Sequence, residues 1–153
     1  MRLRSLVGRS DGRTHSSTLG RGCDGRSRAA RDVTFRGEQA AARTSGGWWL
    51  GANVDREISI DGETYPPGAW VFAIEEGNIV QARRLEIQSF DRLAAAERQP
   101  LAVAGDDMSG PAVELLSGDL QLQDKLTLRG EGRIGALRWV EDELVLAGGF
   151  DGL

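Results

Sequence analysis

The sequence predicts an α+β fold, in which the end of an N-terminal helix precedes a mainly antiparallel two-sheet β-sandwich. Residues 29–36 are compatible with the last turns of a helix, and Gly37 supplies a residue of the type that ends one. Downstream, short segments with alternating apolar residues are separated by turn signals, which is typical of two packed antiparallel sheets. The chain of 153 residues contains 21 glycines and 4 prolines, which suits many tight turns.

This pattern divides the chain into three parts. Residues 1–28 are rich in Arg, Gly and Ser, and they are expected to be disordered or translated from the wrong frame. Residues 29–37 are the predicted helix end, and residues 38–153 are the predicted β-rich head domain. Charge follows a similar division, because residues 1–44 carry a net +6 and the remainder carries −10. A basic arm on an acidic domain is compatible with binding to an anionic partner, although a solvated tail is the simpler interpretation.

The first strands are expected around two adjacent tryptophans. Residues 39–44 form a weak strand, and a Ser-Gly-Gly turn leads into Trp48 and Trp49. Adjacent residues on a strand point to opposite faces, so one tryptophan should fill the core and the other should cover a second layer. In residues 56–63 two isoleucines alternate with polar residues, and Asp61-Gly62 is a hairpin signal.

The clearest hairpin lies in residues 69–80, where Glu-Glu-Gly-Asn turns the chain and Trp70 shares a face with two further apolar residues. Residues 91–99, "DRLAAAERQ", are rich in good helix formers and predict a helix that ends at Pro100. The stretch "AGDDMSGP" is expected as a loop. Two further segments near the C-terminus, "ALRWV" and "ELVLAG", are predicted strands joined through "EDE".

Reaction chemistry has little support in these residues, and we expect no enzyme, no cofactor and no metal site. His15 is the single histidine and lies in the basic arm. A candidate nucleophile in the predicted β-domain therefore has no histidine to act as its base. The string "GEGRIG" at residues 130–135 matches a dinucleotide-binding pattern, but a β-like segment follows it where a helix is required. The acidic pairs and triplets lack the spacing of a calcium loop. Core or interface packing is the favoured role of Trp48, Trp49, Trp70 and Trp139, with a sugar-binding surface as the alternative.

The order of several short motifs resembles the H-type minor pseudopilins of type II secretion and the related FimT-like minor pilins. In that family a long N-terminal helix ends in a pattern like A-R-x-x-A-x-x-R-G. Here "AARDVTFRG" places Arg31, Arg36 and Gly37 at the matching positions. A strand and a Gly-Trp element, a proline corner ("YPPG") and a final alternating segment with a hairpin follow in the family order. The resemblance covers residues 29–149, and nothing in residues 1–28 matches the family's leader or its apolar helix.

This resemblance implies a structural role in protein secretion. The implied partners are other minor and major pseudopilins of the filament, and the secreted substrate is a further one. No nucleic acid is expected. The implied location is the inner membrane with a periplasmic head domain, and the membrane would be reached through an N-terminal helix missing from this chain, which as written has no export signal or anchor. Two alternatives remain open: a membrane-proximal β-domain of an efflux adaptor, and a β-sandwich that binds glycans or nucleic acid.

Overall fold

The structure is a computed structural model that describes residues 15–18, 32–35, 39–44, 46–129 and 132–149. These residues contain fourteen strands and no helix, so the predicted α+β class is wrong and the described part of the chain is all-β. Every strand pair is antiparallel. The expectations for residues 1–28 fall outside the described residues, apart from the backbone of residues 15–18.

Two four-stranded sheets form the centre of the molecule. The first sheet has the order β3-β4-β7-β8, and the second sheet has the order β9-β10-β11-β12. The strands of the first sheet are β3 (Gln39–Arg43), β4 (Trp48–Val54), β7 (Gly68–Glu75) and β8 (Asn78–Arg84). The strands of the second sheet are β9 (Ser89–Ala94), β10 (Leu101–Asp107), β11 (Gly110–Leu116) and β12 (Leu122–Thr127).

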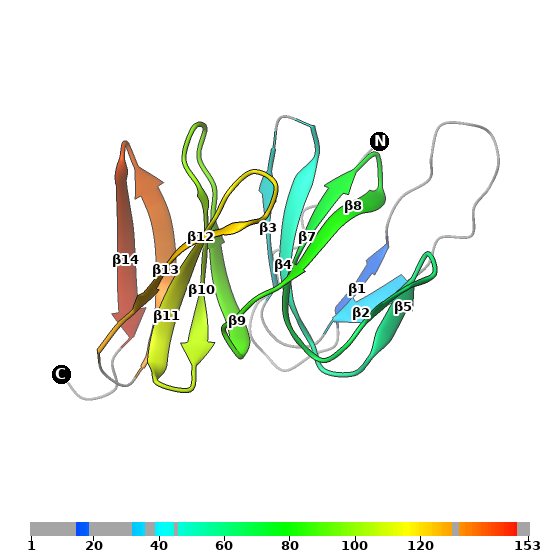
Figure 1. Cartoon of the computed structure of the whole chain (residues 1–153), viewed down its shortest axis with the longest axis horizontal. Coiled ribbons are helices and arrows are strands. Elements are labelled where there is room, and N and C mark those ends of the chain that lie inside the picture. The colour runs from blue at the N-terminus through cyan, green and yellow to red at the C-terminus, as the bar shows by residue number, and fades with distance from the viewer. Residues whose placement is uncertain (1–14, 19–31, 36–38, 45, 130–131, 150–153) are drawn as a thin grey trace.

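Three two-stranded sheets complete the fold. The inserted hairpin consists of β5 (Ile58–Ile60) and β6 (Glu63–Tyr65), and the last hairpin consists of β13 (Arg133–Val140) and β14 (Glu143–Gly149). The third pair joins β1 (His15–Thr18) to β2 (Asp32–Phe35). In Figure 1 these layers lie side by side, with the last hairpin at one end of the stack and β1, β2 and β5 at the other.

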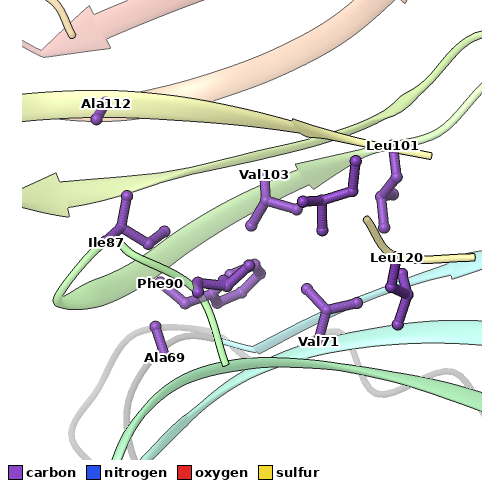
Figure 2. Packing of buried hydrophobic residues seen from close by; sticks show 10 residues of the cluster. Ala69, Val71, Ile87, Phe90, Leu101, Val103, Ala112 and Leu120 are labelled. Carbon is purple, nitrogen blue, oxygen red and sulfur yellow. The ribbon is translucent and has the colours of Figure 1, made fainter. Parts of the chain in front are cut away.

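Apolar side chains fill the spaces between the layers in three clusters. The first cluster lies between the two four-stranded sheets, where the ring of Phe90 packs with Val71 and Val103 (Figure 2). The second lies on the opposite side of the first sheet, against the inserted hairpin, and contains Phe72 and Ile74. The third lies between the second sheet and the last hairpin. Each four-stranded sheet is therefore apolar on both faces, which explains why its strands carry little polar alternation.

The tight turns follow the local sequence closely. Asp61-Gly62 joins β5 to β6 with both residues at positive φ, and Glu76-Gly77 joins β7 to β8 in the same way. Two central residues at positive φ are characteristic of the hairpin turn that matches the twist of its strands. The predicted hairpins at residues 56–63 and 69–80 are confirmed, as is the pairing of the last two strands.

Two predicted helices are wrong. Residues 32–35 of the expected helix end form strand β2, while Arg31, Arg36 and Gly37 lie outside the described residues. Residues 91–94 belong to β9, where Phe90 and Ala94 are buried in two different clusters. The stretch "AGDDMSGP", expected as a loop, forms the ends of β10 and β11, with Met108-Ser109 as the turn. Pairing with β10 and burial on both faces outweigh helix propensity in β9, because propensities of a few tenths of a kcal/mol per residue are easily overridden.

Candidate functional site

The four tryptophans proposed as core or interface residues lie in three different places. Trp48 and Trp49 are half-buried on opposite faces of β4, as predicted, with Trp48 against the second cluster and Trp49 against the first. Trp70 stacks on Phe72 with ring centroids 6.0 Å apart, and its indole N–H donates to the carbonyl of Pro66. Trp139 packs in the third cluster. This distribution provides packing in each layer and no common platform for a sugar.

Glu114 is a fully buried carboxyl group between the two central sheets. Its Oε1 accepts a hydrogen bond from the backbone N–H of Ile87 at 2.7 Å, and its Oε2 has no hydrogen-bond partner. Burial raises the pKa of this carboxyl, and the charge of Glu86 adds to the increase, while the Ile87 N–H and Lys125 oppose it. The hydrogen bond ties the β8–β9 connection to β11, which is a structural task.

Lys125 forms a surface ion network beside Glu114. Its Nζ lies 2.7 Å from Asp107 Oδ2 and 3.6 Å from Glu86 Oε2. The hydrogen bond from Lys125 lowers the pKa of Asp107 and raises that of the lysine. Among the residues that the structure describes, no three His, Cys, Asp or Glu side chains gather in a way that could hold a metal ion.

A second buried carboxyl, Asp91, connects the second sheet to the last hairpin. Its Oδ1 pairs with the guanidinium of Arg133, and its Oδ2 is buried without a hydrogen-bond partner. Nearby, Arg92 Nε donates to the carbonyl of Gly135 at 2.8 Å. At the other end of the hairpin Trp139 Nε1 donates to the carbonyl of Pro100 at 3.0 Å. These polar contacts hold one face of the hairpin against β9 and its following loop.

The opposite face of the last hairpin is exposed and largely apolar. We define the outward face as the exposed side chains that alternate with the packed ones on β13 and β14. Val140 and Val145 are 49% and 48% exposed. The full set is Ala136, Arg138, Val140, Glu143, Val145 and Ala147. Their packed neighbours on the same strands, such as Leu137 and Leu146, lie in the third cluster.

The outward face is the strongest candidate for a functional surface, because Val140 and Val145 lie diagonally across the two strands with Ala136 and Ala147 on the same exposed face, and contiguous exposed apolar patches mark interaction sites. The free edge of β14 adds to it, since β14 pairs with β13 and with no other described strand. The sequence predicts the two strands but not this face. The missed signal is the alternation in "RWVEDELVL", in which the apolar residues continue on both faces of a terminal hairpin.

Within the described parts of the chain, no helix is long and apolar enough to cross a membrane. Comparisons of the chain with protein-family models, with curated proteins and with solved structures found no match.

Proposed function

We propose that this protein is a non-catalytic assembly module that associates with a β-sheet of a partner through its last hairpin. The observation that carries this proposal is the outward face, where Val140 and Val145 are about half exposed at the end of a stack of packed sheets. Burial of apolar surface contributes about 25 cal/mol per Å². A partner sheet that packs on this face removes its apolar side chains from water, and this burial stabilises the complex.

The free edge of β14 supports the same role. Its outer backbone groups have no ladder partner among the described strands, whereas β10, the second strand of the second sheet, is paired on both sides. An extended segment of a partner adds to such an edge through main-chain hydrogen bonds. The two buried carboxyls have structural contacts. Glu114 accepts a hydrogen bond from the backbone N–H of Ile87, and Asp91 pairs with Arg133, so both hold elements of the module together.

A minor pseudopilin is one specific form of such an assembly module. The family resemblance of the β-domain, in its order of a Gly-Trp element, a proline corner and a final hairpin, supports this form. The strand at residues 32–35 weighs against it, because the family motif there belongs to a helix. The filament role therefore stays a prediction. Binding to purified neighbouring pseudopilins supports it, whereas binding to a membrane pump supports the efflux-adaptor alternative.

Site-specific photo-crosslinking in the native cell tests the proposed function. A benzophenone side chain replaces Val145 in one variant and Val80, which is 54% exposed on β8, in a matched control. We expect a discrete protein adduct from position 145 and none from position 80. Mass spectrometry then identifies the captured protein. Equal labelling from both positions, or no adduct from position 145, contradicts the proposal.

A further inference from the structure

The last hairpin covers only part of the second sheet. Its strand β13 contacts β9 and β10, the first two strands of that sheet. On the side of the sheet that faces the hairpin, Ala104 on β10 and Val113 on β11 are fully buried. Further across the same side, Leu115 on β11 is half-buried and Leu126 on β12 is 43% exposed. The apolar surface between these two layers therefore continues beyond the hairpin.

The strand register places Leu126 on this side of the sheet. Leu126 lies opposite Val113, and side chains of directly opposed residues in an antiparallel pair share a face. Val113 belongs to the third cluster, between the second sheet and the last hairpin. Leu115, two residues further along β11, points the same way and packs against that cluster. We call Leu115 and Leu126 the shelf.

The other side of the second sheet is covered by a complete layer. The four strands of the first sheet lie there, and Ala112 and Leu116 of β11 are fully buried in the first cluster. Leu120, in the connection between β11 and β12, is also buried in that cluster. Four strands thus cover this side as far as the end of β11. On the hairpin side, the described strands that pack on the sheet are β13 and β14, and they leave the shelf open to water.

A strand added to the free edge of β14 would lie over the shelf. The third cluster brings Leu144 and Leu146 of β14 together with Val113 and Leu115 of β11, so β14 is the strand of the hairpin that lies toward β11. Neighbouring strands in a sheet are about 4.8 Å apart. The next strand beyond β14 therefore passes above β11 and β12. One extended segment at this place covers the shelf and pairs with the free edge.

The pairing of β10 with β11 shows which kind of strand fits this place. The β9–β10 and β13–β14 pairs share a one-residue bulge, at Asp91 and at Gly135, and "LAVAG" of β10 resembles "LVLAG" of β14. Strand β14 is therefore the counterpart of β10. The strand beside β10 is β11, which is antiparallel and buries Ala112 on one face and Val113 on the other. A strand between two layers is apolar on both faces in this way.

We propose that the shelf and the edge of β14 bind one antiparallel β-strand of a partner protein, and that this strand is apolar on both faces. Its backbone pairs with the 7 residues of β14. Alternate side chains pack on Leu115 and Leu126, and the side chains between them extend the outward face beside Val145. Main-chain hydrogen bonds then provide affinity, and the shelf selects for apolar residues at alternate positions. The inference rests on the proposed function, because it names the segment that the same hairpin binds.

Photo-crosslinking of the full chain in the native cell tests this geometry. A benzophenone side chain replaces Leu126 in one variant and Val145 in another. The control position is Thr127, which is exposed on the opposite face of β12. Tandem mass spectrometry locates the labelled residue of the partner. We expect positions 126 and 145 to label one partner segment at residues of opposite parity, because successive side chains of a strand point to opposite faces. Position 127 should give no adduct.

A charge on the shelf measures how much this surface contributes. Leu126→Glu should lower the yield of the adduct from position 145 at least about tenfold, because the apolar face of the partner strand would bury an unpaired carboxylate. Thr127→Glu, on the other face of the same strand, should leave the yield unchanged. Both side chains are exposed, and thermal unfolding checks that both variants keep the fold.

The outcomes separate this inference from the proposed function. An adduct from position 145 without one from position 126 rejects the strand on the shelf and leaves the assembly role in place. No adduct from position 145 contradicts both. Labelling at residues of equal parity, labelling of two separate segments, labelling of a second copy of this chain, or an unchanged yield in Leu126→Glu also overturns the inference.

Discussion

The ring of Phe90 in the second sheet lies directly over Gly51 in the first, and a Cβ on that glycine would overlap the ring. Phe90 is fully buried among the apolar side chains of the first cluster (Figure 2), and its ring occupies the space that a side chain at position 51 would take. The absence of a side chain at Gly51 therefore sets how closely the two central sheets approach.

Replacing this glycine tests the contact. Gly51→Ala should destabilise the protein by about 1–3 kcal/mol, the usual cost of overpacking a dense core. The control is Gly118→Ala, where a Cβ meets no atom within 4 Å. Urea unfolding followed by tryptophan fluorescence measures both. A Gly51→Ala variant as stable as the control contradicts the placement of Phe90.

Asn53 provides the polar link between the same two sheets. Its Oδ1 accepts from the backbone N–H of Phe90 at 2.7 Å, and its Nδ2 donates to the carbonyl of Phe90 at 3.0 Å. Asn53→Ala leaves both backbone groups without this partner, so we expect a loss of about 1–3 kcal/mol in unfolding free energy. Asn78→Ala, whose amide makes one long contact of 3.5 Å to Glu76, should change it by less than about 0.5 kcal/mol. Equal effects at the two positions would show that Asn53 does not join the sheets.

The ion pair between Asp91 and Arg133 should contribute to the attachment of the last hairpin. Asp91 is 2% exposed whereas the Arg133 side chain is 64% exposed, so the pair lies at the boundary between core and solvent. A double-mutant cycle of Asp91→Asn and Arg133→Met should give a coupling energy of about 1 kcal/mol or more. The exposed pair of Lys125 and Glu86 should give about 0.5 kcal/mol or less. Chemical denaturation of the single and double variants measures both coupling energies. A coupling energy for Lys125 and Glu86 as large as that for Asp91 and Arg133 contradicts the prediction.

The raised pKa of Glu114 predicts a specific dependence of stability on pH. Because the folded-state pKa lies above the ordinary value of 4.5, the folded protein holds this proton more tightly than the unfolded chain. Stability from this group is complete below pH 4.5 and decreases as pH rises through the folded pKa. Asp107 acts in the opposite sense and at lower pH, because its pKa is lowered and its contribution disappears on acidification.

Glu114→Gln removes the titration and keeps an oxygen for the Ile87 N–H. Thermal unfolding across pH 4 to 8 should therefore show a flatter profile in this variant than in the wild type, with the difference growing toward high pH. Glu97→Gln is a control for the loss of one exposed carboxylate. Parallel profiles for the wild type and Glu114→Gln would mean that folding does not raise the pKa of this carboxyl.

The sequence predicted local structure well where a turn has its own chemistry. Asp61-Gly62 and Glu76-Gly77 predict hairpins, because a two-residue hairpin turn needs residues that accept positive φ. Both hairpins are present, with all four residues at positive φ. The prediction failed at residues 91–99, where alanines suggest a helix but burial of Phe90 and pairing with β10 impose a strand. The outward face could not be predicted, because apolar residues occur on both faces of the last hairpin. The positions of Val140 and Val145 in the sequence do not show which of these faces another sheet covers.

A likeness between β10 and β14 is present in the sequence but was not predicted. The strings "LAVAG" at 101–105 and "LVLAG" at 144–148 lie 43 positions apart, and their similarity is confined to five residues. The paired strands make the likeness clear, because β9 and β13 each carry a one-residue bulge at the same place, at Asp91 and at Gly135.

The inserted hairpin marks the connection between second and third strands as the place where this architecture accepts extra polypeptide. Residues 55–67 occupy that connection in the first sheet, while Met108 and Ser109 suffice in the second. Met108 is 87% exposed, and its neighbours on β10 and β11 stay in register up to the turn. A binding loop or an epitope grafted between these two residues would therefore project into solvent from an otherwise unaltered sheet, which makes this protein a carrier for foreign segments.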